Sequence, residues 1–594
     1  MKELEYPFDG EYILKKKKTI KKDLLNQNHQ FVEKNIAILG GSTTNDIKLV
    51  LELFLLNYGI KPNFYESEYN KYWEDAMFEN KELEEFKPDI IYICTSNKNI
   101  INFPNLNDSK EAVKEKLNSE YARFKVMWQT LSNKYQCPII QNNFDYLTYR
   151  ILGNKDVTDY RGKTNFITKL NLMIYDYAEE NDNFYILDIN YLSGQYGLDK
   201  WQDPFYWYMY KYAVAVPAIP LLAFNLANII KAIYGKNKKG LVLDLDNTLW
   251  GGIVGDDGVD NLVIGEETSE GQVYTDFQKY LKEISQMGIL LNINSKNDLD
   301  NALTGLNHVD GVLKPEDFIV IKANWEPKSN NMLAIASELN LGVDSLVFVD
   351  DNPAEREIVK SYVIDVAVPE MKEPYKYIQT LDHCGYFENI KLSSDDMKKN
   401  QMYKENVERN KMVATFNNYD DYLKSLDMKA TIDKFSPIYM ARIAQLTNKS
   451  NQFNLTTKRY NQSEIEETAK NDNYITLYGK LEDKFGDNGV VSVVIGKKTN
   501  ERLDIDLWIM SCRVLKRDME FAMMDSLIKE CVKQNIKELY GYYYPTMKNG
   551  MVKDFYKIQG FTKINEDENG NTIWKFIIDD YKNKNKFIDV EENK

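Results

Sequence analysis

The five residues Asp244–Thr248, which read DLDNT, constrain the fold of this 594-residue chain more than any other short stretch. They directly follow the apolar run Leu241–Leu243, as polar residues do where a buried strand ends. Further apolar runs lie at Ile289–Ile293, Phe318–Ile321 and Ser345–Val349, with helical patterns between them. Strands that alternate with helices form parallel sheets, whose carboxyl ends share one edge. The pattern therefore predicts an open α/β sheet with a ligand site at that edge.

The acidic residues of this edge suit phosphoryl or acyl-phosphate transfer. Asp244 and Asp246 are two positions apart, so in a strand their side chains share one direction. One carboxylate can attack phosphorus while the other moves a proton to the leaving oxygen. Clustered carboxylates repel one another, and Mg²⁺ relieves that repulsion while it holds a phosphate. We expect a Mg²⁺ site made by Asp244, Asp246, Asp350 and Asp351.

Groups that can neutralise phosphate oxygens follow the other strands. Ser295 follows the run LLNIN, and Lys328 lies in the loop after FIVIKA. We expect Thr248 to contact the substrate as well. The alternative is that DLDNT is only a strand-ending turn with Asx hydrogen bonds. That alternative leaves the hydroxyl, the lysine and the Asp-Asp pair at the later strand ends unexplained.

These residues resemble the motifs of the haloacid dehalogenase (HAD) phosphatase superfamily. The resemblance implies that Asp244 is the nucleophile and Asp246 the general acid/base. It also implies that Ser295 is the motif II hydroxyl, Lys328 the motif III lysine, and Asp350 with Asp351 the motif IV acids. Only 49 positions separate Asp246 from Ser295, and 33 separate Ser295 from Lys328. Neither interval has room for a cap domain of about 60 residues or more. An uncapped site is open to a large substrate, such as the prosthetic arm of a carrier protein.

Longer motifs resemble the FkbH-like subfamily of these enzymes over nearly the whole chain. They are LDLDNTLWGGIVGDDG, ANWEPKSNN, LVFVDDNPAERE, RIAQLTNKSNQFNLTTKRY, FGDNGVVSVVI, MSCRVLKRDME and YPTMKNGMVKDFYKIQGF. The resemblance implies an enzyme that dephosphorylates 1,3-bisphosphoglycerate and transfers the glyceryl unit to the phosphopantetheine thiol of an acyl carrier protein. The product serves polyketide or tetronate biosynthesis. The resemblance also implies three folded parts: an SGNH-hydrolase-like flavodoxin-type sheet, a capless HAD Rossmannoid domain and a GNAT-like (acetyltransferase-like) α+β domain.

Polar breaks and changes of pattern predict the boundaries of these parts. We expect a helical arm over 1–35, an SGNH-like domain over 36–235, a HAD-like domain over 236–385, a helical connector over 386–425, a GNAT-like domain over 426–580 and a charged tail over 581–594. In the SGNH-like domain the apolar runs predict strands at Asn35–Leu39, Asp89–Cys94, Pro138–Gln141 and Phe184–Ile189.

The N-terminal domain departs from active SGNH hydrolases. Gly40-Gly41-Ser42 stands after the first strand, where those enzymes place Gly-Asp-Ser. The histidines of the chain, His29, His308 and His383, all lie outside Asp188–Asp203, where the base should fall. Because a serine without a base is a weak nucleophile, we expect this domain to be non-hydrolytic and Ser42 to cap the next helix.

The GNAT-like domain also departs from the pattern of acetyltransferases. In those enzymes a glycine-rich turn binds the coenzyme A pyrophosphate through backbone N–H groups. Here the turn reads RVLKRD, without glycine, so we do not expect free acetyl-CoA to bind. Arg513, Lys516 and Arg517 can instead meet the single phosphate of a phosphopantetheine arm or an acidic carrier helix. Cys512 precedes them, and cationic neighbours and a helix start favour its thiolate. Cys512 is therefore the candidate for an enzyme thioester; the alternative is a small buried apolar residue at a strand end.

Composition argues against several other classes of protein. A formal net charge of −15 argues against nucleic-acid binding, because phosphate contacts need a cationic surface. Five scattered cysteines form neither a disulfide framework nor a zinc motif, which indicates a reducing cytoplasm. The N-terminal residues have no apolar core of a signal peptide. Pro217 and Pro220 interrupt the apolar stretch Tyr212–Ile230, so we expect a buried helix there and no membrane partner.

Three functions remain open at this point. The first is the glyceryl transferase described above, and the second is a Mg²⁺ phosphatase for a phosphoprotein, sugar phosphate or other phosphoester, with passive flanking domains. The third is a non-enzymatic scaffold that docks carrier proteins. The complete acid set argues against the scaffold, whereas the open site and the glycine-free turn do not separate the other two.

Overall fold

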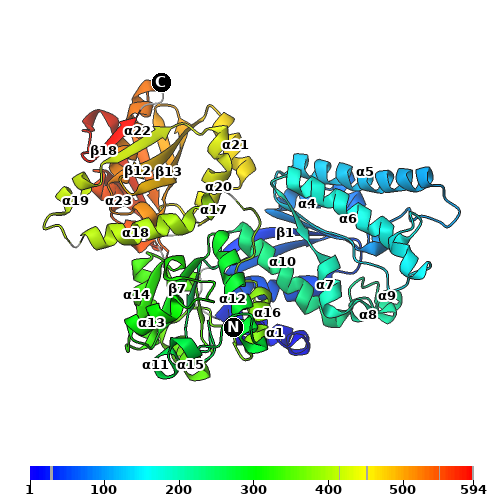
Figure 1. The fold of residues 1–594 in the computed structure, drawn as a ribbon. Coiled ribbons are helices and arrows are strands. Elements are labelled where there is room, and N and C mark those ends of the chain that lie inside the picture. The colour runs from blue at the N-terminus through cyan, green and yellow to red at the C-terminus, as the bar shows by residue number, and fades with distance from the viewer. Residues whose placement is uncertain (27–30, 393, 414, 450–451, 547–548, 592–594) are drawn as a thin grey trace. The chain divides into compact units, whose positions relative to one another are not determined.

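The computed structural model describes residues 1–26, 31–392, 394–413, 415–449, 452–546 and 549–591 (Figure 1). The chain forms two compact units, Met1–Ile233 and Tyr234–Lys594. The first unit holds one parallel sheet. The second holds a smaller parallel sheet and a large mixed one. The predicted fold class, a multidomain α/β chain with parallel sheets, is confirmed.

A five-stranded sheet with the strand order β2-β1-β3-β4-β5 forms the centre of the first unit. Its strands are β1 (Val32–Gly40), β2 (Ile60–Glu66), β3 (Ile90–Cys94), β4 (Ile139–Asn142) and β5 (Phe184–Leu187). All neighbouring strands run parallel. Strand β3 is buried at every position, as expected of a parallel strand covered on both faces. Strand β2 was not predicted, because its Lys-Pro-Asn sequence interrupts the apolar pattern.

Helices cover both faces of this sheet. They are α1 (Gly10–Asn26), α2 (Asn45–Asn57), α3 (Tyr72–Met77), α4 (Lys81–Phe86), α5 (Lys110–Tyr135), α6 (Lys163–Glu180), α7 (Ile189–Tyr196), α8 (Leu198–Trp201), α9 (Pro204–Tyr210) and α10 (Ile219–Ile233). On one face, Phe124 and Trp128 of α5 and Phe166 of α6 pack in a single core with β1 and β3. Helices α1, α2 and α10 pack against one another.

The predicted buried helix is α10. The segment Val216–Ile233 is apolar and long enough to cross a membrane by length and composition, yet 72% of it is buried inside the protein. Its one buried amide, Asn228, accepts a hydrogen bond from the Tyr58 hydroxyl at 2.8 Å. This burial is typical of a core helix.

The smaller sheet of the second unit has the order β8-β7-β6-β9 and is parallel throughout. Its strands are β6 (Gly240–Leu243), β7 (Leu290–Ser295), β8 (Val320–Ala323) and β9 (Leu346–Val349). Its helices are α11 (Val254–Asp257), α12 (Ser269–Gln286), α13 (Leu299–Leu306), α14 (Lys328–Glu338), α15 (Pro353–Tyr362) and α16 (Tyr377–His383). One core joins the sheet to α12, α13 and α16, and a second joins it to α14 and α15. All four strands lie where the sequence predicted them, within two residues.

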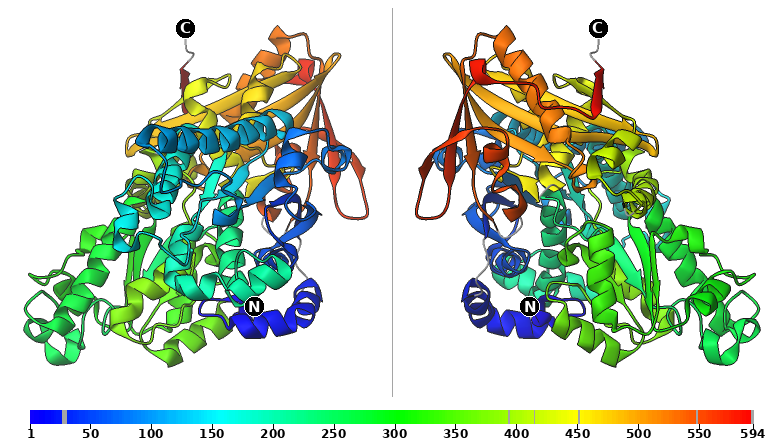
Figure 2. Two further views of the ribbon diagram at one scale, coloured as in Figure 1. Left: turned by 90° about the vertical axis from the view of Figure 1, so that its right-hand side faces the viewer. Right: turned by 90° about the vertical axis from the view of Figure 1, so that its left-hand side faces the viewer.

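The large sheet contains nine strands, and its twist is clear in Figure 2. They are β10 (Met428–Asp433), β11 (Phe453–Asn454), β12 (Tyr474–Asp483), β13 (Gly486–Thr499), β14 (Arg502–Met510), β15 (Glu538–Tyr543), β16 (Thr562–Glu566), β17 (Thr572–Ile577) and β18 (Ile588–Glu591). Helix α22 (Met519–Lys533) packs in one core of this sheet, and α20 (Met440–Lys449) and α21 (Gln462–Lys470) pack in another. A short helix, α23 (Phe555–Ile558), follows β15. The connector before the sheet contains α17 (Ser394–Met397), α18 (Lys399–Val413) and α19 (Tyr419–Ser425).

Candidate active site

The carboxyl ends of the four parallel strands β6 to β9 bring three acidic residues together. Asp244 follows β6, and Asp350 and Asp351 follow β9, the strand next to it. One carboxylate oxygen from each of the three lies within 4.8 Å of the other two. Asp244 and Asp350 are buried and Asp351 is partly buried. We call these three residues the acid cluster.

Lys328, the first residue of α14, reaches into the acid cluster. Its Nζ lies 3.0 Å from Asp244 Oδ1 and 2.5 Å from Asp350 Oδ2. Burial alone would lower the pKa of Lys328, but Asp244 and Asp350 outweigh it and the pKa is raised. Burial and the charge of Asp244 raise the pKa of Asp350 to about 6, against the pull of Lys328. Burial also raises the pKa of Asp351.

The donor set of the acid cluster fits a hard divalent cation. All the ligand atoms are carboxylate oxygens, which Mg²⁺ prefers in proteins. Three carboxylates against one lysine leave an excess of negative charge in a site with little access to water. Such an excess needs a cation, since unpaired buried charge is costly. Asp244, Asp350 and Asp351 are therefore the residues that could hold Mg²⁺.

The carboxylate of Asp246 is not one of the three that meet in the acid cluster, and its hydrogen bonds go to other residues. Its Oδ1 accepts hydrogen bonds from the Trp250 indole and the Val254 backbone N–H, both at 3.0 Å. Its Oδ2 accepts a hydrogen bond from Asn297 Nδ2 at 3.1 Å. Burial raises the pKa of Asp246, although two of these hydrogen bonds lower it. A carboxyl group held by several donors at a raised pKa suits proton transfer better than metal binding.

Two other predicted residues, Thr248 and Ser295, are buried. Thr248 is fully buried, and its hydroxyl accepts a hydrogen bond from the Asp351 backbone N–H at 3.2 Å. Thr248 therefore joins the loops after β6 and β9, and its predicted contact with substrate does not fit this burial. Ser295 is the last residue of β7 and is 2% exposed.

Sequence reasoning missed several residues that fix the loops of this site. Arg356 NH1 donates to the carbonyl oxygens of Asp350 and Asp351, both at 2.7 Å. Asn294 Nδ2 donates to the Lys328 carbonyl at 2.9 Å. Asn294 carried a signal, because a polar residue inside an apolar strand is costly to bury unless it is hydrogen-bonded.

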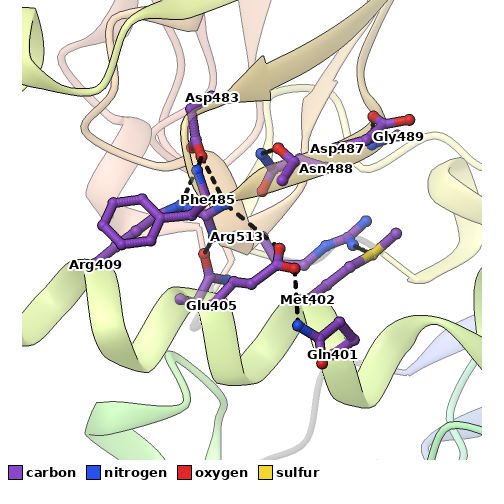
Figure 3. Close-up of polar contacts among 12 residues, drawn as sticks. Gln401, Met402, Glu405, Arg409, Asp483, Phe485, Asp487, Asn488, Gly489 and Arg513 are labelled. Atoms are coloured by element: carbon purple, nitrogen blue, oxygen red, sulfur yellow. Dashed lines mark hydrogen bonds and ion pairs between the residues drawn. The ribbon is translucent and has the colours of Figure 1, made fainter.

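The basic residues that we expected to face a carrier protein behave differently from one another. Arg517 is 6% exposed, and its NH1 lies 3.0 Å from Asp483 Oδ2. Arg513 is 9% exposed, and its Nε donates to Ser511 Oγ at 3.2 Å, while its NH1 contacts the sulfur of Met402 (Figure 3). Burial lowers the pKa of Arg517 to about 10. The predicted carrier surface is therefore wrong for Arg513 and Arg517, whereas Lys516 is exposed.

Helix α18 supplies much of the surroundings of these arginines. Arg409 is 1% exposed and donates through Nε and NH2 to Asp483 Oδ1, at 3.1 and 2.8 Å. Figure 3 shows Arg409 and Glu405 of α18 beside Asp483 and Phe485 of the β12–β13 turn. Asp483 thus forms ion pairs with two buried arginines, Arg409 and Arg517.

The side chain of Cys512 lies outside the described part of the chain. Its backbone opens a three-residue 3₁₀ helix, Cys512–Val514, and α22 begins only at Met519. The predicted stabilisation of the Cys512 thiolate by the N-terminus of a following α-helix is therefore absent.

In the first unit, Ser42 is 5% exposed and Thr44 is the N-cap residue of α2, so the prediction that Ser42 caps this helix is wrong.

Comparisons with known proteins found a family model for part of the chain and several solved structures. Residues 35–231 match the family model described as FkbH, N-terminal domain. The crystal structure of the N-terminal part of BF1531 from Bacteroides fragilis, which contains a phosphatase domain complexed with Mg, is 29% identical in sequence. The match covers 64% of this chain and 99% of that one, with a TM-score of 0.58. No curated protein matches the chain.

Two acetyltransferase structures are similar at a much lower level. The ribosomal-protein-S18-alanine N-acetyltransferase of Escherichia coli is 12% identical over 25% of this chain and 94% of that one, with a TM-score of 0.20. The PaiA N-acetyltransferase of Thermoplasma acidophilum in complex with coenzyme A is 15% identical. That match covers 25% of this chain and 98% of that one, with a TM-score of 0.19. At these TM-scores nothing about this chain follows from them. Residues 35–231 thus resemble the FkbH N-terminal domain, and 64% of the chain is similar to the BF1531 structure.

Proposed function

We propose that the protein is a Mg²⁺-dependent phosphatase that acts through the acid cluster. The observation that carries this proposal is the meeting of three carboxylates and Lys328 at one edge of a parallel sheet. The likeness to BF1531, whose crystallised part contains a phosphatase domain complexed with Mg, supports it. The substrate class is a small phosphate compound.

Each residue of the site has a proposed part in the reaction. Asp244 attacks phosphorus and forms an aspartyl phosphate, while Asp246 gives a proton to the leaving oxygen. Asp246 then takes a proton from the water that hydrolyses the aspartyl phosphate. Lys328 and Ser295 balance the charge on the phosphate oxygens. Mg²⁺, when held by Asp244, Asp350 and Asp351, supplies the positive charge that lets two anions approach each other.

The finer proposal is a glyceryl transferase. Here the substrate is 1,3-bisphosphoglycerate. The thiol of Cys512, the candidate relay, attacks its acyl carbon and inorganic phosphate leaves, and the acid cluster hydrolyses the remaining phosphoester. The phosphopantetheine thiol of an acyl carrier protein then takes the glyceryl group and frees the Cys512 thiol. The FkbH N-terminal domain supports this proposal, because the FkbH-like resemblance implies that reaction. The burial of Arg513 and Arg517 favours the alternative, a phosphatase for another phosphoester, because these cations offer no surface to a carrier. The six-part domain division and the SGNH-like nature of the N-terminal domain also remain proposals.

Mass spectrometry separates the two candidates. The full chain is incubated with 1,3-bisphosphoglycerate, Mg²⁺ and a phosphopantetheinylated carrier protein, and the intact carrier is weighed. We expect a glyceryl adduct with wild type and none with Asp244→Asn. Cys512→Ala should still release phosphate but leave the carrier unloaded.

Each other outcome decides between the candidates. Phosphate release without a carrier adduct supports the plain phosphatase. Loading at the normal rate by Cys512→Ala shows that glyceryl passes directly to the carrier thiol and that Cys512 is not a relay.

A further inference from the structure

Exposed apolar side chains follow three strands at the same sheet edge as the acid cluster. They are Ile253 after β6, Leu299 after β7 and Trp325 after β8, with exposed fractions of 43%, 48% and 70%. We call these three residues the apolar rim. Trp325 is the only one of the eight tryptophans, all of them in the described part of the chain, whose side chain is exposed. Large exposed apolar side chains gathered at one place commonly mark a binding surface.

The residues of the apolar rim lie close in sequence to residues that contact the reacting groups. Trp325 lies three positions before Lys328, which contacts two members of the acid cluster. Ile253 precedes Val254, whose backbone N–H donates to Asp246 Oδ1 at 3.0 Å. Asn297, two positions before Leu299, donates to Asp246 Oδ2 at 3.1 Å.

The loops of the rim also hold one another in place. The Trp325 indole N–H donates to Asp298 Oδ1 at 2.9 Å, which ties the loop after β8 to the loop after β7. Helix α11 packs against the start of α13, since a Cβ on Gly255 would lie 3.6 Å from Asn301 Nδ2. The Trp325 ring is therefore fixed by a hydrogen bond although most of its surface faces water.

The charge around the apolar rim is mainly negative. Asp256, Asp298 and Glu326 are exposed on the same loops. The nearby cation Lys296 is paired with Glu355 at 2.6 Å. A carboxylate on the substrate next to its phosphate would meet repulsion here, whereas an uncharged carbon group would bury apolar surface against the indole.

We propose that Trp325 contacts the organic group next to the phosphate and that the site selects phosphate compounds in which this group is uncharged. This inference rests on the proposed phosphatase function of the acid cluster, in its form for a phosphoester other than 1,3-bisphosphoglycerate, because the organic group of that compound carries a second phosphate. Asp298 is a positioning residue, because it acts through the indole that it holds.

Steady-state kinetics on the full chain with Mg²⁺ test this proposal. The probes are p-nitrophenyl phosphate, whose organic group is uncharged, and 3-phosphoglycerate, which carries a carboxylate. Trp325→Ala should raise KM for p-nitrophenyl phosphate about fivefold to tenfold, the size of a lost aromatic contact, and leave kcat within about twofold. KM for 3-phosphoglycerate should stay within about twofold of wild type, because that compound gains little from the indole.

Matched variants separate contact from general damage. Trp325→Phe keeps a ring and should keep most of the affinity, and Asp298→Asn keeps an acceptor and should resemble wild type. Asp298→Ala should raise KM for p-nitrophenyl phosphate about twofold to fivefold. Tyr362→Ala, at the far end of α15 and 76% exposed, is the control and should change neither KM.

A binding measurement makes the inference independent of turnover. Phenylphosphonate, which is not hydrolysed, should change the tryptophan fluorescence of wild type and not that of Trp325→Phe. An unchanged KM for p-nitrophenyl phosphate in Trp325→Ala, or an equal rise for both substrates, would overturn the proposal. If wild type releases no phosphate from either compound, the proposed phosphatase function fails, and the phenylphosphonate titration alone then decides the role of Trp325.

Discussion

Glu520, in the first turn of α22, shows how a single buried carboxyl group sets a pH response. Its Oε2 is buried and has no hydrogen-bond partner among the described residues. Burial raises the pKa of Glu520 to about 7 from its ordinary value of 4.5, and the charge of Asp518 adds to the rise. The folded state therefore binds this proton more tightly than the unfolded chain does. The bound proton therefore stabilises the folded state fully when the pH is below the pKa of Glu520 in the unfolded chain. This stabilisation is lost as the pH rises through the pKa of Glu520 in the folded state.

Replacing this carboxyl group should remove that pH dependence. We expect Glu520→Gln to raise the free energy of unfolding at pH 8 by about 1–3 kcal/mol and to change it little at pH 4. Urea unfolding at both pH values measures the effect. Glu501→Gln, at a side chain that is 62% exposed, is the control. The explanation would be contradicted if the free energy of unfolding changed between pH 4 and pH 8 by the same amount in wild type and in Glu520→Gln.

At the residue scale, the sequence predicted the three residues of the acid cluster, whereas the hydrogen bonds of Asp246 followed from no sequence pattern. The two-residue alternation that grouped Asp246 with Asp244 holds only inside a strand. Strand β6 ends at Leu243, so both aspartates lie in the following loop, where alternation no longer applies. Asn297, which holds Asp246, lies 51 positions away, and no local pattern relates the two.

Helix α18 is the element whose structure differs most from expectation. The sequence predicted a polar connector, yet Tyr403 and Val407 are buried in a core with the smaller sheet, and Arg409 is buried beside Asp483. The partners of Arg409 and Arg517 could not be predicted, because Asp483 lies on a distant hairpin. Buried charges in such a cluster stabilise only while all of them stay paired.

Removing the shared acid should therefore destabilise the protein strongly. Asp483→Asn removes the carboxylate that pairs with Arg517 and leaves Arg409 with only Glu405, at 3.6 Å. We expect a loss of about 3 kcal/mol in the free energy of unfolding. Asp487→Asn, in the same turn but exposed, should change it by less than about 1 kcal/mol. Chemical unfolding of the two variants provides the comparison. Equal stabilities would show that the Asp483 ion pairs contribute nothing.

For the whole molecule, strands were predicted where a short apolar run marks them, and their pairing over the large sheet was not predicted. The strands around the acid cluster were predicted because each is a short apolar run next to its own functional loop. For the large sheet only the α+β class was predicted. At one edge of this sheet β10 pairs with β18, and these two strands come from opposite ends of the GNAT-like segment. The burial of Arg513 and Arg517 depends on that assembly, so no pattern near Cys512 could reveal it.

The central claim is that the acid cluster releases phosphate with the help of a divalent cation. Phosphate release from an acyl phosphate, measured for wild type and Asp244→Asn across a Mg²⁺ titration, tests it most directly. The control is Asp276→Asn, at a side chain on α12 that is 50% exposed. We expect wild type and the control to depend on Mg²⁺ and to lose activity in excess chelator, and Asp244→Asn to be slower by about a thousandfold or more. Release by Asp244→Asn at the wild-type rate, or full activity in excess chelator, would contradict the account.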